Sequence, residues 1–167
     1  MNNNDILRRI RYTLDLGDDR MMAIYALADL QASRAQVSDW LKKDDDPTFQ
    51  ALSDRRMAIF LNGLIIDRRG PNDSAVPDPE SLLNNNIIFN KLKIAFDLKA
   101  DAVLEIMELA EFHLSKHELS AFFRKPTHKN YRDCKDQVLR KFLQGLQIKY
   151  REDADSVPVF EWKQNTL

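Results

Sequence analysis

Residues 2–70 and 84–152 repeat one pattern at a constant offset of 82 positions, without a gap. Asn2-Asn3-Asn4 returns as Asn84-Asn85-Asn86, and more than a quarter of the aligned positions are identical. Self-similarity over such a length is the mark of a duplication. The sequence therefore predicts a first repeat at 1–70, a Pro-rich linker at 71–83, a second repeat at 84–152 and a tail at 153–167.

Each repeat contains four segments in which apolar residues recur at helical spacing. The fourth is the clearest, because Met57, Phe60, Leu61 and Leu64 are answered by Leu139, Phe142, Leu143 and Leu146. The other three are centred on residues 6–14, 21–28 and 37–41, with counterparts at 88–96, 103–110 and 119–123. No segment alternates as a strand does. We predict an all-α fold, a tandem duplication of a four-helix repeat packed as a pseudo-two-fold helical protein.

A unit of about 70 residues buries too little surface to be comfortably stable alone, so the repeats should share one core or meet across an apolar interface. Gly63 and Gly145 stand inside the fourth helix of each repeat. Since Gly costs about 1 kcal/mol relative to Ala there, these positions are predicted to mark a close helix crossing.

Composition points to a folded, helical chain with 44% hydrophobic and 31% charged residues. A single Cys, Cys134, rules out an internal disulfide. There is no export leader and no apolar run of about 18 residues, which predicts a cytoplasmic protein without a membrane partner. The second repeat carries 13 basic and nine acidic side chains, while the other segments are neutral or acidic. Nucleic-acid binders usually show a stronger basic surface.

The two asparagine triplets are the most unusual local feature. One Asn at each helix start is explained as an N-cap, whose side-chain oxygen accepts a hydrogen bond from the backbone. We expect the other two in each copy to tie the helix start to the facing repeat. The alternative is a polar site on the pseudo-two-fold axis, formed by Asn2, Asn3, Asn4, Asn84, Asn85 and Asn86.

Residues 24–41 and 106–123 each resemble a helix-turn-helix, with a short turn at Gln31-Ala32 in the first copy. In DNA-binding proteins of that kind the second helix enters the major groove. However, Ser33 with Gln36, and Ser115 with Glu118, have the spacing of capping boxes. A side chain that caps its own helix is not free to contact a base. A structural helical corner is therefore the favoured interpretation.

A basic stretch between the third and fourth helices of the second repeat replaces the acidic Asp44-Asp45-Asp46 of the first. Cations beside an aromatic ring could hold phosphates and stack a base, although a solvated loop explains the same residues. The candidate nucleic-acid contacts are Lys116, Arg124, Lys125, His128, Lys129, Tyr131 and Arg132.

Signs of catalysis are weak. His113 and His117 have i, i+4 spacing, but the predicted cap Ser115 separates them, and no third metal ligand stands at a diagnostic distance. Cys134 is interpreted as a small buried thiol. No glycine-rich phosphate loop is present. We therefore predict no catalytic, metal or cofactor site.

Five segments together resemble the YehS-like family of small bacterial proteins, a domain of unknown function present in two copies. They are Asn2 to Arg8, Trp40 to Asp44, Phe60 to Ile65, Asn84 to Ile87 and His128 to Cys134. The likeness covers about residues 2–150 and departs at Lys135, where Gly is expected after Cys134. It implies the helical, two-copy layout and transfers no catalytic residue.

The resulting functional prediction is a non-catalytic binding, adaptor or regulatory module that recognises a protein or peptide between the repeats. The alternative is a nucleic-acid-binding protein that uses the basic second repeat. The aromatic residues of the tail suggest either a segment that docks on the body or on a partner, or a frayed terminus. The sequence leaves the oligomeric state open.

Overall fold

In the computed structural model, residues 1–71 and 76–151 are described, and they contain eight helices and no strand. Both the all-α prediction and the tandem duplication are confirmed, since each helix of the first repeat has a counterpart in the second. The first repeat consists of α1 (Asn3–Leu14), α2 (Asp18–Leu27), α3 (Arg34–Trp40) and α4 (Asp54–Arg69). The second consists of α5 (Asn85–Ala95), α6 (Ala100–Leu109), α7 (Lys116–Phe122) and α8 (Asp136–Tyr150).

The repeated dipeptides Asp15-Leu16 and Asp97-Leu98 end the first helix of each repeat. Asp15 and Asp97 adopt left-handed backbone angles, with φ of 53° and 54°. The leucine that follows is buried in both copies and its backbone N–H closes the last turn of the helix. Such a left-handed residue satisfies the terminal carbonyls of a helix, which explains why this pair recurs.

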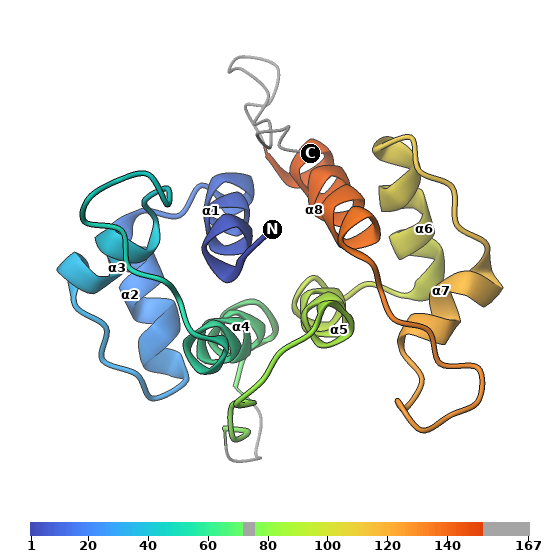
Figure 1. Cartoon of the computed structure of the whole chain (residues 1–167), viewed down its shortest axis with the longest axis horizontal. Helices are drawn as coiled ribbons and strands as arrows, with labels where there is room; N and C mark the ends of the chain where they lie inside the picture. The colour runs from blue at the N-terminus through green and yellow to red at the C-terminus, as the bar shows by residue number, and fades with distance from the viewer. Residues whose placement is uncertain (72–75, 152–167) are drawn as a thin grey trace.

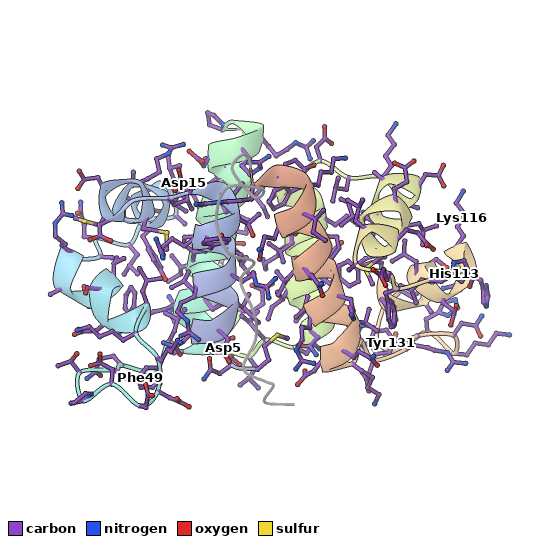
Figure 2. The ribbon with its side chains drawn as sticks, turned by 90° about the horizontal axis from the view of Figure 1, so that it is seen from above. Asp5, Asp15, Phe49, His113, Lys116 and Tyr131 are labelled. Atoms are coloured by element: carbon purple, nitrogen blue, oxygen red, sulfur yellow. The ribbon has the colours of Figure 1, made fainter. Side chains whose placement is uncertain are left out.

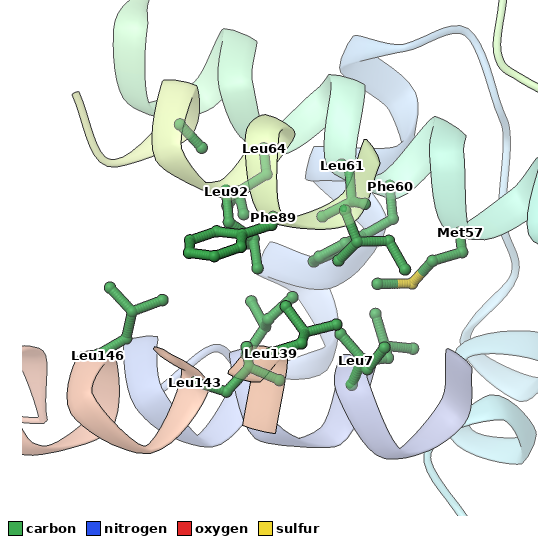
Figure 3. Close-up of a cluster of buried hydrophobic side chains, with 14 of the residues drawn as sticks. Leu7, Met57, Phe60, Leu61, Leu64, Phe89, Leu92, Leu139, Leu143 and Leu146 are labelled. Carbon is green, nitrogen blue, oxygen red and sulfur yellow. The ribbon is translucent and has the colours of Figure 1, made fainter. Parts of the chain in front are cut away.

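Helices α1, α4, α5 and α8 form the centre of the molecule, with α2 and α3 outside them on one side and α6 and α7 on the other (Figure 1). Within this centre α4 packs on α5 and α1 on α8, so the main contacts run between the repeats. The two repeats therefore share one core, to which both copies contribute (Figure 3). Its side chains include Leu7, Met57, Phe60, Leu61, Leu64, Phe89, Leu92, Leu139, Leu143 and Leu146.

The four central helices are parallel, as the hydrogen bonds at their two ends establish. At one end the side chain of Asp54, the first residue of α4, accepts from Asn3 of α1 and from the backbone N–H of Leu83, just before α5. At the other end Arg151, after α8, donates to the Tyr12 carbonyl at the end of α1. All four helix N-termini thus lie at one end of the molecule, where Asp5 is found, and Asp15 marks the opposite end (Figure 2).

The predicted close crossings are confirmed at both glycines. A Cβ at Gly63 of α4 would lie 2.0 Å from the backbone oxygen of Ile24 in α2. At Gly145 of α8 the same atom would lie 2.2 Å from the oxygen of Ile106 in α6. Only glycine allows each outer helix to approach the core this closely.

The helix-turn-helix prediction needs one correction. Helix α2 ends at Leu27 and α3 begins at Arg34, so the connection is longer than the predicted turn at Gln31-Ala32. The cause is a left-handed residue, Asp29, with φ of 68°, and Glu111 repeats it with φ of 56°. Both capping boxes are formed as predicted. None of the helices in the described part of the chain is long and apolar enough to cross a membrane.

Candidate functional site

The first asparagine of each triplet caps its helix, as predicted. The side-chain oxygen of Asn2 accepts from the backbone N–H of Asp5, and that of Asn84 accepts from Ile87. In the first copy the side chain of Asp5 accepts a hydrogen bond from the Asn2 backbone N–H and completes a capping box. Ile87 has no polar side chain and cannot do so. The amide nitrogens of both caps are left for other partners, since no hydrogen bond engages them among the described residues.

The second asparagine joins the starts of two parallel helices within one repeat. Asn3 donates from Nδ2 to the Leu52 carbonyl at 3.1 Å and to the Asp54 carboxylate at 2.8 Å. Asn85 makes the equivalent contacts with the Cys134 carbonyl at 3.0 Å and the Asp136 carboxylate at 2.7 Å. The contacts of Asn3 thus fix α1 to α4, and those of Asn85 fix α5 to α8.

The third asparagine is buried and holds the segment that precedes α4 or α8. Asn4 donates to the carbonyls of Trp40 and Gln50, each at 2.9 Å, and accepts from the Leu52 N–H at 3.0 Å. Asn86 likewise donates to the carbonyls of Phe122 and Arg132 and accepts from the Cys134 N–H. The expectation that these amides tie the facing repeats together is therefore wrong, because every partner belongs to the same repeat. A sequence pattern shows which residues are polar but not which copy supplies their partners.

A cavity of about 430 Å³ lies between the repeats at the end where the four helix N-termini meet, and we call it the central cavity. Its lining comes from three segments: the start of α1, the approach to α4, and the start of α5. Five of the six triplet asparagines line it, and Asn86 does not. The residues are Met1, Asn2, Asn3, Asn4, Ile6, Asp44, Phe49, Ala51, Leu52, Asp54, Leu83, Asn84, Asn85 and Ile88.

The central cavity combines amides, carboxylates and apolar side chains. Asp44 and Asp54 supply negative charge, and Phe49, Met1 and Leu83 supply apolar surface. Sequence reasoning identified only asparagines here and missed these residues, among them Asp54, which contacts both the first repeat and the segment before α5. The sequence did contain a sign of its importance, because the equivalent position of the second repeat is also an aspartate, Asp136.

A second cavity, of about 560 Å³, lies beside α7 and the basic loop, and we call it the α7 cavity. Lys129, Tyr131 and Arg132 line it together with His117, but the carboxylates of Glu118 and Asp133 face it as well. Partial burial and Asp133 raise the pKa of Tyr131. Phe49 and Tyr131, at equivalent positions of the two repeats, lie at the same end of the molecule in opposite halves (Figure 2).

The remaining candidate nucleic-acid contacts do not converge on the α7 cavity. Lys116 forms an ion pair with Asp101 at 3.2 Å, and Arg124 donates to the Ser120 hydroxyl at 3.3 Å. The ring of His128 accepts from the Asn130 backbone N–H at 2.9 Å and so serves the loop. Lys125 is exposed outside the cavity lining.

The two spaced histidines are separated as predicted. His113 precedes the cap Ser115 and contacts Glu108 at 2.8 Å, whereas His117 belongs to α7. Within residues 1–71 and 76–151, no group of three or more His, Cys, Asp or Glu side chains could hold a metal ion.

Cys134 is buried, as predicted, and its backbone N–H is held by Asn86. Burial, with a further contribution from Asp136, raises the pKa of the thiol to about 12. The thiolate is the reactive form of cysteine, and a thiol with so high a pKa stays protonated near neutral pH. Cys134 is therefore assigned a structural role in the loop that Asn86 holds.

Comparison with known proteins agrees with the two-copy architecture. The model of a family described as a protein of unknown function, DUF1456, matches residues 3–70 and again residues 85–152. The chain is similar to the uncharacterized protein YehS of Escherichia coli (strain K12), with 45% identity over 147 residues, covering 87% of this chain and 94% of that protein. No solved structure matches it. With two matches that together span most of its length, the chain belongs to this YehS-like, two-copy family.

Proposed function

We propose that the chain is a non-catalytic, cytoplasmic binding module that recognises a segment of another protein in the central cavity. The observation that carries this proposal is the composition of the cavity lining. Residues from both repeats line one pocket that is open to solvent, and its lining mixes apolar side chains with amide groups. Concave, partly apolar sites with a few polar groups are where proteins bind ligands.

The polar groups fit a peptide. The amide nitrogens of Asn2 and Asn84 can donate to peptide carbonyls, because capping engages only their side-chain oxygens. Asp44 and Asp54 favour a basic side chain or an amino terminus nearby. Phe49 offers an aromatic surface for an apolar residue of the same segment. The expected ligand is therefore a short segment with one basic and one apolar side chain.

Photo-cross-linking in cells tests the proposal. A photoreactive phenylalanine analogue at Phe49 of the full chain should capture one protein in near-stoichiometric yield. The matched control places the same analogue at Tyr131, the equivalent position of the second repeat, which lies outside the central cavity. Capture of the same products from both positions, or of nucleic acid alone from Phe49, would overturn the proposal.

A pair of capping variants tests the amides themselves. Asn2→Ser and Asn84→Ser keep a neutral cap that accepts from the backbone but remove the Nδ2 donor. We expect both to fold normally and to lower the cross-linking yield at Phe49. The control is Ser33→Asn, the reverse substitution at the N-cap of α3. Ser33 lies outside the cavity, so this variant should leave the yield unchanged.

Nucleic-acid binding is the second candidate, supported by the grouping of Lys129, Tyr131 and Arg132 at the α7 cavity. Fluorescence anisotropy with single- and double-stranded oligonucleotides would measure it. Binding to phosphates weakens with salt, and each lost contact lowers the log–log slope by about 0.7 for single strands. Lys129→Glu should therefore reduce both affinity and slope. Lys99→Glu, on the surface away from the cavity, is the control. Absence of binding at low salt would remove this candidate.

A further inference from the structure

The first repeat carries a carboxylate beside α3. Asp39, near the end of that helix, accepts a hydrogen bond from the Lys42 ammonium at 2.9 Å, and Lys42 also donates to the Thr48 hydroxyl. Both members of the ion pair are half-buried. One acid is thus balanced by one cation, and the pair joins α3 to the loop that follows it.

The second repeat lacks this acid. At the position of Asp39 the chain has Ala121, which lines the α7 cavity. The backbone around the two residues is alike, since the N–H of Gln50 donates to the Asp39 carbonyl at 3.3 Å and that of Arg132 donates to the Ala121 carbonyl at 3.2 Å. The α7 cavity therefore adjoins the place where the first repeat has a carboxylate.

Four positions that are neutral in the first repeat carry a basic side chain in the lining of the α7 cavity. They are His117, Lys129, Arg132 and Lys135, which correspond to Ala35, Pro47, Gln50 and Ser53. Within residues 1–71 and 76–151, no hydrogen bond or ion pair engages these four side chains. Relative to the first repeat, the place beside α7 has lost the acid of α3 and gained three permanent cations.

The second repeat also brings two carboxylates to the lining, and both are engaged by the protein. Glu118 accepts from the Ser115 backbone N–H at 2.9 Å and completes the capping box of α7. That hydrogen bond lowers the pKa of Glu118, with the charge of Arg132 a minor contribution. Asp133 interacts with the Tyr131 hydroxyl. The cations are therefore available to an anion from outside the chain.

We propose that the α7 cavity binds a small molecule in which a phosphate monoester is joined to a flat ring, as in a mononucleotide. The phosphate group lies beside Ala121, in the place that the Asp39 carboxylate takes in the first repeat. Lys129, Arg132 and Lys135 bind its oxygens. A phosphate monoester carries up to about two negative charges at neutral pH, which suits three cations better than a single carboxylate does. The guanidinium of an arginine also matches the spacing of phosphate oxygens.

Tyr131 supplies the surface for the ring. Its interaction with Asp133 restrains the aromatic side chain in the cavity lining, and nucleobases stack on such aromatic faces. The cavity volume of about 560 Å³ is within the range of roughly 300–1,000 Å³ that is usual for sites of small ligands. The cavity is therefore large enough for a phosphate, a sugar and a base.

The same cations support the nucleic-acid candidate, but their grouping favours a single phosphate. A polymer binds to cations placed along a track that follows its backbone. Here Lys116 is paired with Asp101, and Lys125 lies outside the lining. The cations that remain gather in one cavity, as a single terminal phosphate requires.

Isothermal titration calorimetry of the full chain with the common nucleoside 5′-monophosphates, each in turn, tests the proposal. At least one should bind with a Kd below about 1 mM. The corresponding nucleoside, which lacks the phosphate, should bind about tenfold more weakly or worse, because the charged hydrogen bonds are lost. Ribose 5-phosphate should bind about fivefold more weakly or worse, because it has no ring to stack.

Three variants locate the site, and circular dichroism shows whether each of them folds. Arg132→Gln introduces the residue of the first repeat, Gln50, at an exposed position and should weaken nucleotide binding about tenfold or more. Lys125→Gln removes an exposed cation of the same loop outside the lining and should change the affinity by less than about twofold. Ala121→Asp restores the acid of the first repeat and should abolish binding. Arg132→Gln decides the outcome even if Ala121→Asp does not fold.

Four results would overturn the proposal. One is the absence of binding by every nucleotide at millimolar concentration. A second is equal weakening by Arg132→Gln and Lys125→Gln, as a general attraction of anions would produce. A third is ribose 5-phosphate binding as tightly as the nucleotide. The fourth is tighter binding of a single-stranded oligonucleotide with a steep salt dependence, which would assign these cations to the nucleic-acid candidate.

None of these results bears on the peptide proposed for the central cavity. The two cavities share no lining residue, so cross-linking at Phe49 and nucleotide binding at Arg132 succeed or fail independently.

Discussion

Gly63 of α4 lies directly against the backbone carbonyl of Ile24 in α2, with no room for a Cβ between them. The second repeat reproduces the contact between Gly145 of α8 and Ile106 of α6. The duplicated glycine thus sets how closely each outer helix packs on the shared core. The neighbouring atom in both places is main chain, which cannot rotate away as a side chain can.

Gly63→Ala and Gly145→Ala should each lower the free energy of unfolding by at least about 2 kcal/mol, because a methyl group would force the two helices apart. Chemical denaturation followed by circular dichroism measures the change. Gly17→Ala is the control: a Cβ added there would meet no atom within 4 Å, and the φ of −81° suits alanine. If all three variants unfolded at the same denaturant concentration, the close crossings would not exist.

Asn4→Ala and Asn86→Ala should destabilise the chain more than changes at the caps. Each removes three hydrogen bonds and leaves two carbonyls and one N–H without a partner in or near the interior. An unsatisfied buried polar group costs about 1–3 kcal/mol, so we expect a loss of roughly 3 kcal/mol or more. Asn2→Ala and Asn84→Ala should lose about 1 kcal/mol. A reversed order in thermal or denaturant unfolding would contradict the assigned roles.

Arg151 and Arg69 close the opposite end of the core in equivalent ways but with different exposure. Arg151 donates to the Tyr12 carbonyl at 2.7 Å and Arg69 to the Ile94 carbonyl at 2.9 Å, in both cases across the repeats. The side chain of Arg151 is 10% exposed and that of Arg69 is 43% exposed. The guanidinium of Arg151 also stacks on the Tyr12 ring.

Arg151→Ala should therefore lower stability by about 2 kcal/mol, since charged hydrogen bonds of buried groups are worth about 1.5–3 kcal/mol. Arg69→Ala should lower it by less than about 1 kcal/mol, because Arg69 and its ion-pair partner Asp97 are exposed and exposed ion pairs contribute little. Raising the salt concentration should diminish the effect of Arg69→Ala more than that of Arg151→Ala. Equal losses from the two substitutions at every salt concentration would argue against the asymmetry.

The duplication made the helices predictable but left their pairing open. The offset of 82 positions shows that α1 corresponds to α5 and α4 to α8. This correspondence would be the same whether α4 packed on α1 or on α5. Residues such as Asp54, which contacts Asn3 and the N–H of Leu83, decide the matter through neighbours 29 and 51 positions away. Hydrophobic spacing carries no such information. Arg69 and Arg151 were visible as an identical pair, yet their role depends on the parallel direction of the helices.

The asparagine triplets likewise combine contacts that the sequence predicts with contacts that it does not. Capping by Asn2 and Asn84 follows from local sequence, because donor and acceptor lie three residues apart. The partners of Asn4 lie 36 to 48 positions away, and no local rule identifies them. Five of the six triplet asparagines line the central cavity, and Asn86 does not, although its hydrogen bonds match those of Asn4.

Cys134 should make the alkaline stability of the chain depend on one thiol. Its pKa is raised by burial from 9.0 to about 12, so above pH 9 the unfolded chain releases this proton while the folded chain retains it. Stability is then lost as the pH rises from about 9 to 12, by about 1.4 kcal/mol per unit. Cys134→Ala removes the titrating group and leaves the backbone contact with Asn86. The difference in free energy of unfolding between parent and variant should therefore change across this range in favour of the variant.

Denaturant titrations at pH 8, 9 and 10 measure that difference, and other groups that titrate, such as Tyr25, affect both proteins alike. A thiol reagent gives an independent check: at pH 8 the native chain should react at least about a hundredfold more slowly than the unfolded chain, because so little thiolate is present. Parallel pH profiles for parent and Cys134→Ala, together with rapid labelling of the native chain, would show that the thiol is accessible and that Asn86 does not hold its loop closed.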